Sequence, residues 1–373
     1  MKSLICCLAL TLASHAAETP PSWAGKLKGA GEVRVAVTPP EGNRFAHLSW
    51  PKAVRTKDGT IVLAYIAGTF HGNGGGGSPA ISVSKDHGKS FSPPKILQEF
   101  GPGKEYTQSG NLALGVAADG ALVLLAMAFT GDEGNSIFGW RSTDQGESWT
   151  ATDTSALGPN KTGSVFGNIL PVSGQGLVVL GHYRQGSQPH TKGIWMATSS
   201  DQGLVWNTPV PISDVSAVEP VLVRTSGGRL LVISRGTARA GQEYVSVSDD
   251  AGKTWTTSLS PLAAESGAKY SLAAPFATEN PEIPNELLAL TTERAKGGEG
   301  DDFPSRIWLW RADAGQLDWK RERVLIEFPR GKGLPNDLGY PWLLHVEGGR
   351  WLMYYYHGVG HGVNYIWVAE VEI

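Results

Sequence analysis

Histidine, tyrosine and arginine side chains are the residues of this 373-residue chain whose types best suit a reactive site. His71 lies in a glycine-rich loop, and a histidine changes its charge near neutral pH. Tyr340 precedes a proline, and Arg235 follows an apolar stretch. An arginine can neutralise a carboxylate while tyrosine and histidine move protons. These three residues therefore suit proton transfer on a substrate with an acidic group, and the polar stretch 182–184 could face the same site.

Cysteine chemistry is excluded by the position of the two cysteines. Cys6 and Cys7 lie in the apolar run of a predicted signal peptide, residues 1–17. The mature chain would therefore have no thiol nucleophile, disulfide or thiolate metal site. His357 and His361 have a spacing that could suit a metal ion, but no third ligand is in view. We therefore expect neither a metal nor a cofactor.

A short turn motif recurs five times along the chain, and it favours a repeat architecture. It reads Ser-x-Asp-x-Gly and is followed by an aromatic residue. The carboxylate can accept hydrogen bonds from the N–H groups of its own turn, and the glycine supplies a positive φ. A calcium loop is disfavoured, because each copy offers only one or two carboxylates and no distal glutamate. We therefore interpret the motif as structural; its aspartates are Asp86, Asp144, Asp201, Asp250 and, in a worn copy, Asp313.

The segments between these turns predict strands. Each segment holds an apolar strand after a Gly-rich turn and then strands that alternate with period two. Each repeat accommodates about four strands, which is one blade of a propeller. We therefore predict an all-β fold, a six-bladed β-propeller, as a single domain over 32–373. A flexible lead-in is expected at 18–31, and a strand at 31–37 is expected to add to the last blade.

The charge of the chain and its apolar segments limit the kinds of partner that the protein is expected to bind. The formal net charge is −3 and no basic run occurs, so nucleic acid is not expected as a partner. The apolar run near the N-terminus is too short to span a bilayer, so no membrane association is expected. The predicted signal peptide indicates a secreted or periplasmic protein. We expect a monomer that acts on a glycan or another acidic-sugar substrate.

The repeated turns resemble the Asp-boxes of the sialidase superfamily, and the resemblance runs from about residue 32 to the end of the chain. Within it, Glu219 and Arg235 match the segment that carries the glutamate base and a clamp arginine. Tyr340 matches the tyrosine nucleophile. The resemblance implies that arginines bind the sugar carboxylate bidentately and that Glu219 takes the proton of Tyr340. A neutral tyrosine suits this reaction, since a carboxylate nucleophile would be repelled by the sugar carboxylate beside the oxocarbenium-like centre.

A third clamp arginine is implied in the strand before the worn turn. Arg306 resembles that residue, and Arg311 is its competitor. Alternation along a strand places these two side chains on opposite faces of the sheet, so at most one of them can serve.

The chain departs from the sialidase pattern at three places and resembles a divergent member. Ser49 stands where the first clamp arginine belongs, and Asn73 stands about where the acid/base aspartate belongs. The strand at 354–357 lacks the glutamate that supports the first arginine. His71, beside the position of the lost aspartate, is the leading candidate for the proton donor.

Three functions fit these residues. The first is an exo-acting glycoside hydrolase of the exo-alpha-sialidase type that removes a terminal acidic sugar, sialic acid or a related one. The second is a lyase for uronic-acid polysaccharides that uses Tyr340, His71 and Arg235. The third is a non-catalytic propeller that binds glycans through its many tryptophans and tyrosines. Retention of Glu219 with Tyr340 favours the hydrolase.

Overall fold

The computed structural model describes residues 23–28, 31–72, 74–130, 134–237, 241–267, 269–296, 303–331 and 334–373. Over these residues the chain is all-β, as predicted, and its one helical element is a 3₁₀ turn at Ser155–Leu157. No helix in the described part of the chain is long and apolar enough to cross a membrane. The predicted signal peptide and Asn73 lie outside the described residues.

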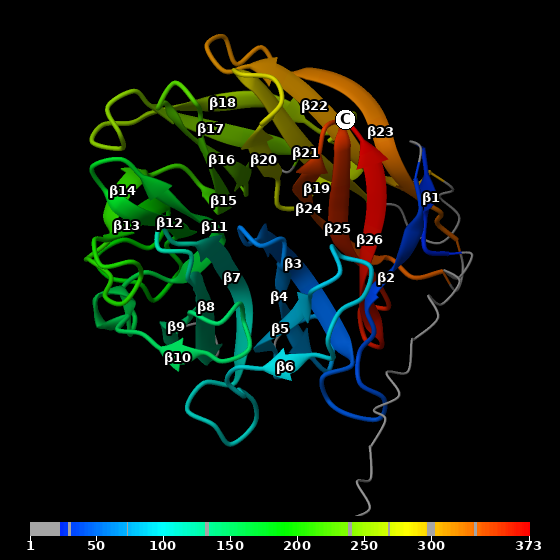
Figure 1. Ribbon diagram of the computed structural model, residues 1–373, viewed down its shortest axis with the longest axis horizontal. Helices are drawn as coiled ribbons and strands as arrows, with labels where there is room; N and C mark the ends of the chain where they lie inside the picture. Colours follow the sequence, from blue (N-terminus) through cyan, green and yellow to red (C-terminus); the bar gives the residue numbers. More distant parts are fainter. Residues whose placement is uncertain are drawn as a thin grey trace, which may run out of the picture.

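The strands form antiparallel units that follow one another along the chain and surround a common centre (Figure 1). Their bounds, unit by unit, are β3 (His47–Arg55), β4 (Ile61–Gly68), β5 (Ser78–Ser84) and β6 (Lys95–Ile96); β7 (Gln108–Val116), β8 (Leu122–Thr130), β9 (Gly134–Ser142) and β10 (Thr150–Ala151); β11 (Ser164–Val172), β12 (Gly176–His182), β13 (Ile194–Ser199) and β14 (Val210–Ser213); β15 (Ala217–Arg224), β16 (Leu230–Gly236), β17 (Gln242–Ser248) and β18 (Thr256–Ala263); β19 (Tyr270–Leu272), β20 (Phe276–Glu279), β21 (Glu286–Ala295), β22 (Ser305–Asp313) and β23 (Lys320–Phe328); and β24 (Asp337–Glu347), β25 (Arg350–Gly358) and β26 (Asn364–Glu372).

Two further strands come from the N-terminal segment. β2 (Val33–Val37) pairs antiparallel with β26, which confirms the strand expected to add to the last unit. β1 (Lys26–Leu27) pairs with β23, and Ala24 beside it is buried. The prediction of a flexible lead-in over 18–31 is therefore wrong for residues 23–28. Backbone hydrogen bonding to β23 and burial of Ala24 fix this segment against the protein.

The repeated turns have the predicted local structure. In the first copy, the Asp86 carboxylate accepts hydrogen bonds from the backbone N–H of Ser90 at 2.9 Å and from the Ser84 hydroxyl at 2.7 Å. The Ser84 oxygen in turn accepts the N–H of Gly88 at 2.8 Å, and Gly88 has a φ of 86°. The same bonds recur around Asp144, Asp201 and Asp250. The motif is therefore structural, because it satisfies the polar groups of a tight turn.

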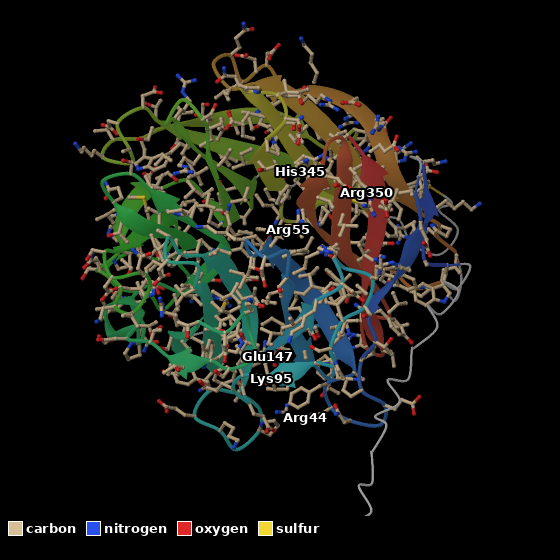
Figure 2. The ribbon with its side chains drawn as sticks, in the orientation of Figure 1. Arg44, Arg55, Lys95, Glu147, His345 and Arg350 are labelled. Carbon is tan, nitrogen blue, oxygen red and sulfur yellow. The ribbon has the colours of Figure 1, made fainter. Side chains whose placement is uncertain are left out.

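Contacts between successive units hold the arrangement together. A Cβ at Gly88 would lie 2.9 Å from Leu352, so the first turn packs directly on β25 of the last unit. Arg55 donates to the Val346 carbonyl at 2.8 Å, also from the first unit to the last. Lys95 donates to the Glu147 carbonyl at 2.5 Å from the first unit to the second (Figure 2). The apolar strands beneath these contacts form the core.

Candidate active site

A β-bulge in the first strand of three units places the most distinctive residues of the site. Trp50, Glu219 and Tyr340 each have a positive φ, between 52° and 57°, where the strand register shifts. Each is followed by a proline, which has no N–H to leave unpaired at the bulge. A non-glycine residue at positive φ is strained, and such strain concentrates at functional sites. All three residues line one pocket.

Glu219 and Tyr340 form a directly hydrogen-bonded pair. The Tyr340 hydroxyl donates to Glu219 Oε1 at 2.5 Å, and both side chains are buried. Arg235 Nε lies 2.7 Å from Glu219 Oε2, and this ion pair fixes the position of the carboxylate. Burial and the Glu219 carboxylate raise the pKa of Tyr340. The phenol is therefore neutral in the resting protein, with a fixed carboxylate ready to accept its proton.

Two buried residues lie beside this pair: His182, from the stretch that was expected to face the site, and Lys52, which the sequence analysis did not single out. The Glu219 backbone N–H lies 3.2 Å from His182 Nδ1. Burial, with Arg184 and Arg235 nearby, lowers the pKa of His182 to about 3, so the neutral ring can accept that N–H. Lys52 is also buried, and burial lowers its pKa to about 7 although the Glu219 charge opposes the change.

The surroundings of Lys52 are largely aromatic. Its ammonium nitrogen lies 4.1 Å from the ring centroid of Phe166, 5.0 Å from that of Trp342 and 5.9 Å from that of Tyr340. Cation–π contacts of this kind partly replace the lost water.

Three arginines line the pocket, each at or just beyond the end of the strand that pairs with the first strand of its unit, whose place β19 and β20 share in the fifth unit. They are Arg184 after β12, Arg235 on β16 and Arg294 on β21. Arg294 donates to the Leu338 carbonyl at 2.8 Å and to the Tyr356 hydroxyl at 2.6 Å, and its guanidinium lies 5.4 Å from the Tyr340 ring centroid. Sequence reasoning missed Arg294.

The structure does not bring Arg306 to this pocket. Its Nη1 lies 2.7 Å from Glu265 Oε2, and its Nε lies 3.4 Å from Glu327 Oε2. Its competitor Arg311 pairs with Glu286 at 2.6 Å. The repeat itself could have revealed Arg294, because Arg294 follows an apolar strand in the same way as Arg235 does in its own repeat.

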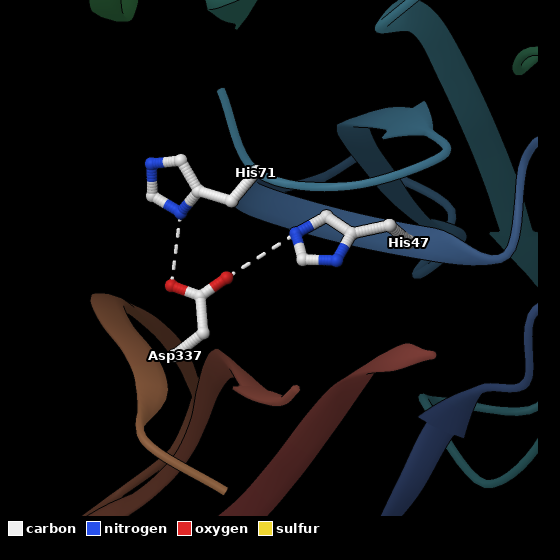
Figure 3. A group of neighbouring side chains, drawn as sticks. All are labelled: His47, His71 and Asp337. Atoms are coloured by element: carbon white, nitrogen blue, oxygen red, sulfur yellow. Dashed lines mark hydrogen bonds and ion pairs between the residues drawn. The ribbon is translucent and has the colours of Figure 1, made fainter. Parts of the chain in front are cut away.

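The remaining predicted residues divide between the pocket wall and the part of the chain that is not described. Ser49 is buried and lines the pocket, so no arginine stands at that position. His71 lines it as well and is partly exposed. His71 Nδ1 lies 2.9 Å from Asp337 Oδ1, and His47 Nε2 lies 3.2 Å from Asp337 Oδ2 (Figure 3). Sequence reasoning identified neither His47 nor Asp337.

The pocket suits an anionic ligand. Its volume is about 290 Å³, and its charged lining is the three arginines with one carboxylate, Glu219. Trp50 adds an aromatic wall, with its ring centroid 6.2 Å from that of Tyr340 and 5.0 Å from that of His71. The arrangement can bind an acidic group beside a neutral nucleophile and its base.

Solved structures of differing activity share this fold. A Dyadobacter fermentans protein of unknown function is 20% identical with a TM-score of 0.67, covering 93% of this chain and 99% of that one. The NanB sialidase from Streptococcus pneumoniae is 11% identical with a TM-score of 0.67, covering 91% and 70%. An alpha-L-arabinanase from Penicillium chrysogenum, complexed with arabinobiose, is 15% identical with a TM-score of 0.64, covering 92% and 98%. At these identities the likeness establishes the fold.

Sequence comparison gives the family. No curated protein matches the chain. The model of the BNR repeat-like domain matches residues 102–296, which is more than half of the chain. The matched segment contains three of the four complete turn motifs as well as Glu219, Arg235 and Arg294. The chain therefore belongs to the family of proteins with a BNR repeat-like domain.

Proposed function

We propose that this protein is an exported, sialidase-like exo-glycoside hydrolase that releases a terminal acidic sugar from a glycan. In this proposal the antiparallel units are the six blades of a β-propeller, and the pocket lies where their first strands meet. The hydrogen bond of 2.5 Å between the Tyr340 hydroxyl and Glu219 carries the proposal. A tyrosine paired with a fixed carboxylate has the form of an activated nucleophile.

The reaction follows from this geometry. Glu219 Oε1 takes the phenolic proton as Tyr340 Oη forms a bond to the anomeric carbon, and the bond from that carbon to the leaving oxygen breaks. Water then attacks the same carbon, the bond from that carbon to Tyr340 Oη breaks, and Tyr340 regains its proton from Glu219. The proton that the water loses passes to the group that protonated the leaving oxygen. Sialidases are known to use tyrosine in this role. The assignment of His71 as the donor of a proton to the leaving oxygen stays a prediction.

The arginines identify the substrate class within this proposal. Arg235 and Arg294 line the same pocket as Tyr340, and guanidinium groups bind carboxylates in a bidentate manner. Arg184 supplies a third positive charge at the pocket wall. These charges favour a sugar whose carboxylate lies next to the reacting carbon, as in sialic acid or a related acid.

The test is sugar release by wild type and by Tyr340→Phe. The substrates would be an aryl sialoside, whose leaving group needs little protonation, and a panel of uronic-acid glycans. Wild type should release a saturated monosaccharide, and Tyr340→Phe should lose roughly a thousandfold or more in kcat, since it removes the nucleophile. Tyr354→Phe is the matched control, because the Tyr354 hydroxyl is buried and has no hydrogen-bond partner among the residues that the structure describes.

The outcomes separate the candidate functions. Release of an unsaturated sugar from a uronic-acid polymer would show that the protein is a lyase and not a hydrolase. Glycan binding without any product would show that the protein only binds glycans. Equal rates of sugar release by wild type and Tyr340→Phe would show that Tyr340 is not the nucleophile.

A further inference from the structure

Two histidines and an aspartate converge at the rim of the pocket, and they come from segments far apart in the chain. His47 opens β3, His71 lies in the loop after β4, and Asp337 opens β24. One ligand atom from each residue lies within 4.8 Å of the other two. Figure 3 shows both rings directed at the carboxylate, with one oxygen facing each ring.

The surroundings of His47 point to a cation. The ring is buried, and its Nδ1 lies 3.0 Å from the Gly362 carbonyl oxygen, which can only accept a hydrogen bond. Nδ1 therefore carries a proton, and in the neutral ring Nε2 presents a lone pair. That Nε2 lies 3.2 Å from Asp337 Oδ2, a second acceptor, and has no hydrogen-bond partner. A ring nitrogen and a carboxylate oxygen placed side by side in this way are two ligand atoms that one cation could bind.

This arrangement is the one that metal-binding histidines commonly show. A ligating histidine usually donates its other N–H to a backbone carbonyl or a carboxylate, which fixes the ring and its tautomer. The Asp337 carboxylate is held in the same manner. It accepts from the Tyr356 hydroxyl at 3.2 Å and from the Asn364 amide at 3.3 Å.

We propose that His47, His71 and Asp337 bind one divalent transition-metal ion such as Zn²⁺. Two imidazole nitrogens and a carboxylate oxygen suit zinc and its neighbours, at about 2.0 to 2.2 Å from the ion. His71 is about one-third exposed, so its ring can adjust to the ion while His47 and Asp337 stay fixed.

The location of the ion gives it access to the substrate. His71 and His47 line the pocket that contains Tyr340, so the coordination positions left open by three protein ligands face that pocket. Water or a sugar hydroxyl would occupy them, and with the ion bound His71 would not be the proton donor of the proposed hydrolase reaction. Arg294 lines the same pocket and donates to the Tyr356 hydroxyl, which in turn donates to Asp337, so its positive charge opposes ion binding.

The experiment measures ion binding and does not use sugar release. Tag-free, chelator-treated full-length protein would be titrated with ZnCl₂ by calorimetry and with CoCl₂ by visible absorption. Wild type should bind one ion per chain and show the absorption bands of Co²⁺ with nitrogen and oxygen ligands. Loss of a residue that only hydrogen-bonds to a metal ligand weakens metal binding roughly 10- to 100-fold. Asp337→Asn and His71→Ala each alter a ligand itself, so each should weaken binding by more than this.

Two controls make the result specific. His190→Ala removes an exposed histidine outside the group and should bind the ion as wild type does. Tyr340→Phe should also bind normally, so failure of the proposed hydrolase reaction would leave this result intact. The proposal is overturned if wild type binds neither ion, or if Asp337→Asn and His71→Ala, folded as judged by circular dichroism, keep wild-type affinity.

Discussion

Replacing Lys52 by methionine should remove a large pH dependence from the stability of the protein. Burial lowers the pKa of this lysine from 10.5 to about 7. Between these two values the unfolded chain binds a proton at Lys52 that the folded protein does not bind, so stability rises with pH. At about 1.4 kcal/mol for each pH unit, the full difference corresponds to about 5 kcal/mol. The rise between pH 7 and pH 9 is about 2 kcal/mol, because the folded group is half protonated at pH 7.

Equilibrium unfolding in urea, followed by the fluorescence of the 13 tryptophans, gives the free energy of unfolding at pH 6, 7 and 9. At pH 6 the Lys52→Met variant should be the more stable protein by about 2 to 4 kcal/mol, after deducting the lost contacts with Glu219 and the aromatic rings. The advantage should shrink as the pH rises, since wild type then folds with a neutral lysine.

A second lysine variant provides the control. Lys57→Met removes an exposed charge just beyond β3. Its free energy of unfolding should change with pH as that of wild type does. The reasoning is refuted if wild type and Lys52→Met gain the same free energy between pH 7 and pH 9. In that case Lys52 would keep its proton throughout, and its aromatic surroundings would stabilise the ammonium fully.

Two further predictions test the arginine assignment and the turns. Arg294→Met should raise KM or lower kcat/KM about 30- to 150-fold. This loss corresponds to a charged hydrogen-bonding partner worth about 2 to 3 kcal/mol. The kcat/KM of Arg306→Met should stay within about twofold of wild type. Michaelis–Menten kinetics on the cleaved substrate measure both, and an equal loss in the two variants would contradict the placement of Arg294. Ser84→Ala should lower the free energy of unfolding by about 1 to 3 kcal/mol, because it leaves the buried N–H of Gly88 without a partner. Urea unfolding measures this, and unchanged stability would show that the turn does not depend on that bond.

The repeated turns and the spacing between matched residues carried most of the sequence prediction. The turns predicted strands and their order because each copy is a local structure, complete within about eight residues. Glu219 and Tyr340 could be paired before any coordinates because both match sialidase segments, in which such a glutamate takes the proton of the tyrosine. Arg294 was missed because the same resemblance pointed to Arg306, in the strand before the worn turn, and not to the end of the preceding strand.

The other omissions have a common physical reason. His47 and Asp337 are 290 residues apart in sequence, and their contact depends on the last unit lying beside the first. Lys52 reads as an ordinary strand residue until its burial among aromatic rings is known. The segment at 23–28 has the composition of a linker, yet pairing with β23 orders it. Long-range contacts of this kind leave no local pattern in the sequence.

The bulges separate three residues that line the pocket from the residues that maintain the fold. Strand pairing resumes at Lys52, Val221 and Trp342 in the three units, whichever side chain stands at the bulge. The same framework thus presents tryptophan in one unit, glutamate in another and tyrosine in a third. A single substitution at such a position changes the reactive surface while the hydrogen-bonded sheet around it is conserved. Divergence of activity within this fold can therefore proceed one unit at a time, and an engineer can vary Trp50 without redesigning its neighbours.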